Sequence, residues 1–275
     1  MKKIIAMMLA LMLVMTGIAV FTACDGDKTP EETTPEQPTE APTTEEQTTE
    51  APAPAVIKMA TNAYFQPYEF YQDGKIVGID AEIAAAIAEK LGMTLEIVDM
   101  EFDSIITAVN EGSVDFGMAG MTVTEDRLLE VDFSISYANG VQTIIVKEDS
   151  PITSVDDLFA EGASYKVGVQ LGTTGDIYAT GDFGSENVTT YSNGNEAVLA
   201  LLGGSVDCVI IDNEPAKALV AANEGLKTLE TAYANEDYAI CVKKGNSELL
   251  AKIDQAIKEL TADGTIDAIV AKYIK

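Results

Sequence analysis

The chain has 275 residues, with 45 Asp and Glu against 17 Lys and Arg, no His, no Trp and a formal net charge of -28. Without His there is no Ser-His-Asp relay and no imidazole metal site, and three Cys are too few for a disulfide scaffold or an all-cysteine zinc site. The acidic balance argues against nucleic acid as a partner and against a basic membrane-binding surface. We therefore expect no nucleic-acid partner, no metal and no other cofactor.

Residues 1–23 predict a signal peptide. Lys2 and Lys3 precede an apolar run that extends to Ala23. The next residue completes Phe21-Thr22-Ala23-Cys24, which resembles the lipobox of bacterial lipoproteins and makes Cys24 the expected lipidation site. An uncleaved membrane anchor is the alternative for a run of this length. Both interpretations place the rest of the chain outside the cytoplasm, attached to the cell membrane.

Residues 24–55 predict a disordered tether that follows the lipidated Cys. Thr, Glu and Pro dominate, and almost no apolar residue larger than Ala is present. Such a segment cannot bury enough surface to offset the entropy of ordering, and Pro and like charges extend it. An O-glycosylated stalk would have the same geometry.

From residue 56 short strands alternate with helices. The expected elements in chain order are a strand over 56–60, a helix capped by Asp80 and ended by Gly92, a strand over 95–98, a helix over 104–110 and a strand over 114–118. This alternation predicts an α/β fold with mostly parallel sheets and helices on both faces.

A repeat suggests two similar α/β halves. Residues 108–118 read AVNEGSVDFGM and residues 200–210 read ALLGGSVDCVI. Both predict a helix that ends at Gly, then an Asp and a short apolar strand; chance similarity of one such unit is the alternative. Ligands of open α/β sheets bind beyond the carboxyl ends of strands, so the residues that follow these two strands are the candidate site.

Arg127 follows the first of these strands, in a helix that Thr124 is expected to cap. It is the one Arg of the chain. An exposed salt bridge would be served equally well by Lys, whereas a carboxylate is best held by the planar fork of Arg. We expect Arg127 to bind an anionic ligand group, together with Thr122.

Asp212 ends the second strand. It either caps the next helix or presents its carboxylate to a ligand ammonium group. A third candidate is the Gly- and Thr-rich turn at 172–175, whose backbone N–H groups suit a small anion. One guanidinium and one carboxylate on separate halves match a zwitterion, and a free amino acid is the commonest small zwitterion.

Several motifs in order resemble the extracellular solute-binding proteins of ABC importers for polar amino acids, the family 3 type. They are 61–70 (TNAYFQPYEF), 78–80 (GID), 120–127 (GMTVTEDR), 131–134 (VDFS), 168–174 (GVQLGTT) and the Asp-Gly at 263–264. The resemblance covers about residues 56–275.

The resemblance implies a two-lobed periplasmic-binding-protein-like fold of type II, with mixed, mostly parallel sheets and two hinge crossovers, expected near 139–142 and 232–237. Lobe 1 would be 56–139 plus 236–275, and lobe 2 would be 140–235. It also implies a partner permease, capture of a free amino acid by hinge closure, and an extracytoplasmic lipoprotein that is not an enzyme.

The resemblance also assigns ligand-binding residues. The ligand carboxylate would be held by Arg127, Thr122 and the turn at Thr174, and the ammonium group by Asp212 and the Gly120 carbonyl. Phe65 and Phe102 would sandwich the apolar part of the ligand, ordinary core packing being the alternative. At Asn62, members that bind cationic side chains commonly have Asp, so we expect an uncharged polar side chain.

Two other functions use the same fold. A cyclohexadienyl or arogenate dehydratase would be an enzyme, although no acid–base constellation in the sequence demands catalysis. A ligand-sensing receptor module would continue into a membrane helix or signalling domain. Cys208 and Cys241 lie in apolar strands on different predicted lobes and are expected to be buried free thiols.

Overall fold

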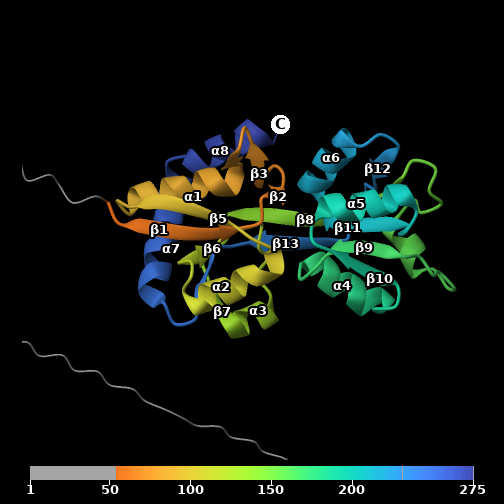
Figure 1. Cartoon of the computed structure of the whole chain (residues 1–275), viewed down its shortest axis with the longest axis horizontal. Coiled ribbons are helices and arrows are strands. Elements are labelled where there is room, and N and C mark those ends of the chain that lie inside the picture. The colour runs from red at the N-terminus through yellow and green to blue at the C-terminus, as the bar shows by residue number, and fades with distance from the viewer. Residues whose placement is uncertain (1–53, 231, 275) are drawn as a thin grey trace, which may run out of the picture. The chain divides into compact units, whose positions relative to one another are not determined.

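The computed structural model describes residues 54–230 and 232–274. In them the chain forms two α/β lobes, each with its own sheet and with helices on the outside (Figure 1). The predicted signal peptide, Cys24 and the tether up to residue 53 lie outside the described residues. No helix in the described part of the chain is long and apolar enough to cross a lipid bilayer.

The first lobe is built around a five-stranded mixed sheet. Its order is β5 (Thr94–Asp99), β1 (Val56–Thr61), β6 (Phe116–Gly117), β14 (Cys241–Lys243) and β7 (Val131–Phe133). β5 and β6 run parallel to β1, whereas β14 runs antiparallel to β6 and β7. A small antiparallel sheet contains β2 (Tyr64–Phe65), β3 (Glu69–Gln72) and β4 (Lys75–Val77).

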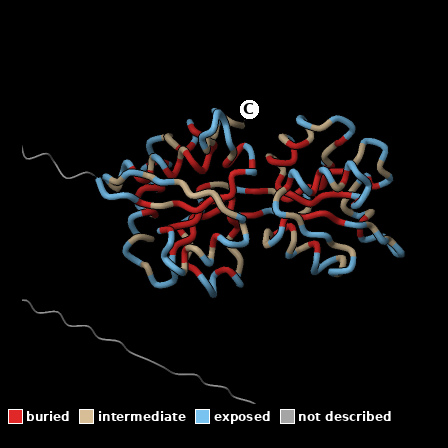
Figure 2. Tube along the Cα trace, viewed as in Figure 1, coloured by how far each residue is buried: buried red, intermediate tan, exposed pale blue. Residues whose placement is uncertain are grey.

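Helices cover both faces of the first sheet because alternate residues of its strands are apolar. Ile57 and Met59 of β1 belong to one buried cluster and Ala60 belongs to another. The helical elements of this lobe are α1 (Ile79–Lys90), η1 (Phe102–Ser104), α2 (Ile105–Glu111), α3 (Glu125–Glu130), α7 (Ser247–Ala262) and α8 (Thr265–Tyr273). Figure 2 shows the buried residues concentrated along the central strands of both lobes.

The second lobe is built around a six-stranded mixed sheet. Its order is β10 (Val188–Tyr191), β9 (Val167–Gln170), β11 (Cys208–Asp212), β8 (Ala138–Lys147) and β12 (Leu226–Thr228), and β13 (Ala234–Tyr238) also pairs with β8. The first three are parallel, and β8 is antiparallel to all its neighbours. Its helical elements are η2 (Val155–Phe159), α4 (Thr174–Phe183), α5 (Gly194–Gly203) and α6 (Asn213–Ala222).

The chain passes between the lobes on β8 and β13, which we call the crossover strands (Figure 1). They form an antiparallel pair in which Gln142 is opposite Ala234 and Ala138 is opposite Tyr238. The two-lobed α/β fold with mixed sheets is therefore confirmed. Antiparallel pairs take a larger share than the predicted mostly parallel sheets, because β8 and β14 run against their neighbours.

The sequence repeat corresponds to one helix–turn–strand unit in each lobe. α2 ends at Gly112 and α5 ends at Gly204, both in the left-handed conformation, with φ of 76° and 75°. Asp115 then accepts a hydrogen bond from the backbone N–H of Lys58 at 2.7 Å, and Asp207 accepts one from that of Lys166 at 2.7 Å. Each Asp therefore connects its strand to the neighbouring parallel strand.

Replacing either repeat glycine with alanine is expected to lower the free energy of unfolding by about 1 kcal/mol, because a left-handed residue with a Cβ is strained. Nothing crowds a Cβ at Gly112, and only the flexible end of Lys147 lies near one at Gly204, so the two costs should be similar. Urea unfolding measures both. Asn substitutions, which tolerate this conformation better, are the controls, and an unchanged stability in Gly112→Ala or Gly204→Ala would contradict the prediction.

Candidate functional site

A small cavity between the two lobes brings together the predicted site residues, apart from Thr174. It is lined by Asn62, Phe65, Glu69, Phe102, Ala119, Gly120, Thr122, Arg127, Gln170, Thr173 and Asp212. Its free volume is about 20 Å³, which is the space of about one water molecule. A free amino acid therefore fits only when the walls of the cavity move apart.

Arg127 is 7% exposed and is placed by the first turn of α3. The Thr124 side chain caps this helix as predicted and accepts a hydrogen bond from the Arg127 backbone N–H at 3.2 Å. Nη1 of the guanidinium donates to the Thr122 carbonyl at 2.6 Å, and Nη2 donates to the Gly172 carbonyl of the second lobe at 3.0 Å. These bonds use two of its five N–H groups and hold the fork at the boundary between the lobes.

The two predicted aromatic residues both line the cavity. The guanidinium carbon of Arg127 lies 5.3 Å from the ring centroid of Phe102, a cation–π distance. Phe65 stacks on Tyr68 with the ring centroids 5.7 Å apart. Phe102 therefore orients the guanidinium, and Phe65 is fixed by a buried aromatic neighbour.

Asp212 ends β11 and is 8% exposed. It precedes α6, but its side chain makes no capping hydrogen bond to that helix. Oδ2 accepts a hydrogen bond from Gln142 Nε2 at 2.7 Å, and Oδ1 accepts one from the Tyr238 hydroxyl. Burial and the negative charge of Glu236 raise the pKa of Asp212 well above its usual range, so a cation beside it would favour the ionised form.

Arg127 and Asp212 come from different lobes and line one cavity. Burial lowers the pKa of Arg127, and the negative charges of Glu236 and then Asp212 oppose this shift. The cavity thus presents a cation from one lobe and a carboxyl group from the other, which is the arrangement that the sequence predicted for a zwitterion.

An amide pair also joins the lobes across the cavity. Gln170 Nε2, at the end of β9, donates to Asn62 Oδ1 at 3.0 Å and to the Ser192 carbonyl at 3.1 Å. Asn62 Nδ2 donates to the Met100 carbonyl at 2.8 Å. Both side chains are buried, so a ligand reaching them meets neutral donors and acceptors rather than an ionised carboxylate.

The prediction that Asp80 caps α1 is wrong. Gly78 occupies the cap position, and Asp80 is fully buried, with Oδ2 accepting from the Gly120 backbone N–H and from the Tyr137 hydroxyl, each at 2.8 Å. Burial raises its pKa to about 6. An Asp at the start of a helix has the sequence pattern of an N-cap. That local pattern contains no information about the contact of Asp80 with Gly120, which lies forty positions later.

Glu69 lies beside Asp80 and lines the cavity. Burial, followed by the charge of Asp80, raises the pKa of Glu69 well above its usual range. Neither carboxyl oxygen of Glu69 has a hydrogen-bond partner among the described residues, so an ionised Glu69 would be an uncompensated buried charge. Neither Glu69 nor Asp80 forms an ion pair with a described basic side chain. The wall next to Gly120 therefore favours a neutral Glu69.

Thr174 is buried as the first residue of α4 and does not line the cavity. Thr173, the N-cap residue of α4, lines the cavity instead. Its hydroxyl accepts a hydrogen bond from the Asp176 backbone N–H at 3.3 Å and donates one to the Gln170 carbonyl at 2.8 Å. The predicted turn is thus at the site, displaced by one residue because the helix begins at Thr174. α4 directs its N-terminal N–H groups toward this region.

Two lining residues were not predicted, Glu69 and Gln170, whereas Thr173 lies in the predicted turn and Ala119 directly follows the first repeat strand. Each lies within or next to a motif that the sequence analysis identified. Gln170 carried the clearest signal, since it is the polar end of an otherwise apolar strand that precedes the Gly- and Thr-rich turn. Glu69 had no comparable local signal, because its surroundings are set by residues on α1 and after β6.

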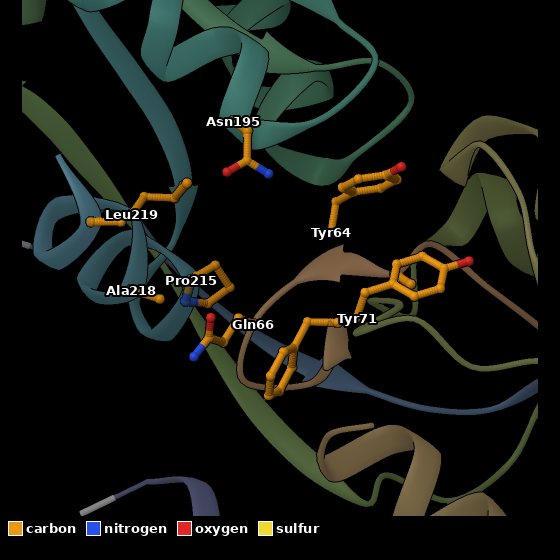
Figure 3. Close-up of a pocket in the computed structure, with 10 residues that line it drawn as sticks. Tyr64, Gln66, Tyr71, Asn195, Pro215, Ala218 and Leu219 are labelled. Atoms are coloured by element: carbon orange, nitrogen blue, oxygen red, sulfur yellow. The ribbon is translucent and has the colours of Figure 1, made fainter. Parts of the chain in front are cut away.

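A second hollow of about 240 Å³ lies between the β2–β3 hairpin and helices α5 and α6. Figure 3 shows Tyr64 and Gln66 of the first lobe opposite Asn195 and Pro215 of the second, with the Tyr71 ring extending away from them. None of its lining residues is ionisable as an acid or base at neutral pH. The smaller cavity, with its opposed charges, is therefore the better candidate for a zwitterion.

The described residues contain no cluster of His, Cys, Asp and Glu that could hold a metal ion. Cys208 and Cys241 are buried and free, as predicted. Burial raises the pKa of both thiols to about 12, which makes them unreactive.

Two lobes joined by two crossover strands, with opposed charges at a shared cavity, are the arrangement expected of a solute-binding protein. The chain matches the family "Bacterial extracellular solute-binding proteins, family 3" over residues 57–275 and belongs to it. Membership of an extracellular family places the protein outside the cytoplasm.

Three similar proteins illustrate the family. The arginine-binding extracellular protein ArtP of Bacillus subtilis (strain 168) is 32% identical over 222 residues, covering 78% of this chain and 84% of ArtP. A solved ancestral arginine-binding protein bound to glutamine is 41% identical, with a TM-score of 0.75 over 80% of this chain and 98% of that one. The ancestral amino acid-binding protein AncCDT-1, a precursor of cyclohexadienyl dehydratase, is 32% identical, with a TM-score of 0.73 over 80% of this chain and 96% of AncCDT-1.

Proposed function

We propose that this protein is the substrate-binding lipoprotein of an ABC importer, that it captures a free amino acid with a polar, uncharged side chain, and that it delivers this ligand to a permease. The observation that carries the proposal is the position of Arg127 and Asp212, which come from different lobes and line one cavity. Cys24 would be the lipid-bearing residue, and residues 25–55 would be the tether that keeps the protein close to the permease.

Capture proceeds by hinge closure. The lobes, 56–139 plus 236–275 and 140–235, separate about the crossover strands and expose one half-site each. The ligand carboxylate accepts hydrogen bonds from free N–H groups of Arg127, from Thr122 and from the turn at 173–174. The ligand ammonium group donates to the Asp212 carboxylate and to the Gly120 carbonyl. A ligand that contacts both lobes at once stabilises the closed form, because only that form offers both sets of contacts.

The preference for an uncharged side chain is supported by three lining residues. Asn62 and Gln170 offer amide groups, and the raised pKa of Glu69 favours its neutral form. A cationic side chain would need a carboxylate that is free to ionise, and burying it unpaired is costly. Similar ancestral arginine-binding proteins have been solved bound to glutamine and bound to arginine, so the preference rests on the lining residues of this chain.

Isothermal titration calorimetry should show L-glutamine binding at least about tenfold more tightly than L-arginine, since a buried cation without a partner carries a larger penalty than this. Asn62→Asp is the matched variant and should reverse the order, because it supplies a carboxylate at the same position. Tighter binding of L-arginine by the unmodified protein would contradict the uncharged preference but not amino-acid binding. No heat with any of the twenty amino acids would overturn the proposed function.

A dehydratase is the second candidate, because AncCDT-1 has this fold and is a precursor of such an enzyme. An importer's binding protein, by contrast, would bind its ligand without making or breaking a covalent bond. Incubation with prephenate and arogenate separates the candidates: conversion of either one supports the enzyme, and amino-acid binding without conversion supports import.

A further inference from the structure

Four buried side chains form a hydrogen-bonded network behind the cavity, which we call the hinge network: Asp212, Gln142, Glu236 and Tyr238. Gln142 Nε2 donates to Asp212 Oδ2 at 2.7 Å and to Glu236 Oε2 at 2.9 Å. The Tyr238 hydroxyl donates to the other oxygen of Asp212. All four residues are at least nine-tenths buried.

The strand register places the network on one face of the sheet. Gln142 on β8 is opposite Asp212 on β11 and Ala234 on β13. Residues two apart on a strand point to the same face, so Glu236 and Tyr238 lie on the same side as Ala234. Glu236 is thereby a diagonal neighbour of Gln142, within reach of its side chain. Gln142, Glu236 and Tyr238 all belong to the crossover strands, which carry the hinge.

We propose that Glu236 is a positioning residue for ligand capture, which fixes Gln142 so that Gln142 and Tyr238 hold the Asp212 carboxyl group toward the cavity. This inference rests on the proposed function, in which Asp212 receives the ligand ammonium group. Glu236 does not line the cavity, so it acts through Gln142 and not on the ligand itself.

The chemistry of the amide explains why Glu236 is needed. Gln142 has two side-chain N–H groups, and each has a carboxyl oxygen as its acceptor. Without Glu236 one N–H would be buried and unpaired, and the amide would rotate toward another acceptor. With Glu236 present, a reversed amide would place its oxygen against two carboxyl groups, so a single orientation is favoured.

Glu236 also links the network to the cationic half of the site. Its negative charge is the largest of those that oppose the lowering of the Arg127 pKa by burial. Tyr178 of α4 lies against it, and burial followed by the Glu236 charge raises the pKa of that tyrosine. The contacts of Glu236 with Gln142 and Tyr178 are direct, whereas its effect on Arg127 is a longer-range charge effect, so its main effect on ligand capture is expected through Gln142.

A double-mutant cycle with L-glutamine as the probe tests whether Glu236 acts through Gln142. Glu236→Ala should weaken binding about tenfold, the usual effect of one lost hydrogen bond to a charged group. Gln142→Met, which keeps the volume but has no N–H, should weaken it by at least as much. The double variant should bind no more weakly than Gln142→Met alone, because residues in one chain of contacts are not additive.

A further tenfold loss in the double variant would overturn the inference, since it would mean that the two residues act independently. Glu236→Gln keeps an acceptor of the same shape and should recover most of the affinity that Glu236→Ala loses. Recovery by Gln shows that the hydrogen bond matters; equal losses in both variants would contradict the positioning role. Thermal unfolding of each variant checks that it is folded.

Asp212→Asn in the same titration separates this inference from the proposed function. If Asp212→Asn binds L-glutamine as tightly as the unmodified protein does, Asp212 is not the ammonium receptor and the proposed site fails. If Asp212→Asn binds at least tenfold more weakly while the cycle is additive, the site stands and only the positioning role of Glu236 fails.

Discussion

Replacing Arg127 with alanine is expected to weaken the binding of L-glutamine by roughly a hundred- to several-thousand-fold, which corresponds to about 3–5 kcal/mol. The guanidinium is buried at the boundary between the lobes and is already oriented by Thr122, Gly172 and the ring of Phe102. Without it the ligand carboxylate would be buried with no cation to compensate its charge. Calorimetry measures the loss directly.

Two further variants make the Arg127 experiment specific. Arg127→Lys keeps the charge but not the planar fork, so it should recover only part of the affinity. Lys75→Ala removes the same charge from an exposed position on β4 and should leave affinity unchanged. An Arg127→Ala protein that is folded, as its thermal unfolding would show, and that binds L-glutamine with unaltered affinity would remove the cationic half of the site.

Local signals in the sequence were sufficient for the elements. The glycines at 112 and 204 end their helices in the left-handed conformation, and Thr124 caps α3, because each of these roles depends on residues only a few positions apart. The repeat was visible for the same reason. It gave one helix–turn–strand unit in each lobe and thereby the positions after β6 and β11 where the site lies.

Contacts between distant residues were not predictable in this way. Asp80 was interpreted as a helix cap, whereas its partner is Gly120. Gln142 and Glu236 are 94 positions apart and meet only because β8 and β13 are adjacent. The charges of the site could be predicted from single residues of unusual type, such as the one Arg, but the groups that orient those charges could not.

The buried pair of Glu69 and Asp80 is expected to make the protein less stable as pH rises. Both carboxyl groups have raised pKa values in the folded chain, that of Asp80 to about 6. The folded state therefore binds more protons than the unfolded state, whose carboxyl groups ionise near pH 4. The stability that these groups contribute is fully present below that pH and is lost as pH rises through the folded pKa values.

Glu69→Gln should remove the larger part of this pH dependence. The amide has the same shape and does not need to take up a proton when the chain folds. Each pH unit in which Glu69 is protonated in the folded chain and ionised in the unfolded chain lowers the free energy of unfolding by about 1.4 kcal/mol. Between pH 5 and pH 7 the variant should therefore lose less of its free energy of unfolding than the unmodified protein does.

Urea unfolding of both proteins at several pH values between 5 and 8 measures this difference. Asp212, whose pKa is also raised, is present in both proteins and cancels in the comparison. Glu89→Gln, at an exposed position of α1, is the matched control and should leave the pH dependence unchanged. Parallel curves for Glu69→Gln and the unmodified protein would show that Glu69 is ionised in the folded chain. The cavity would then carry a full negative charge beside Gly120, which would favour a cationic ligand over an uncharged one.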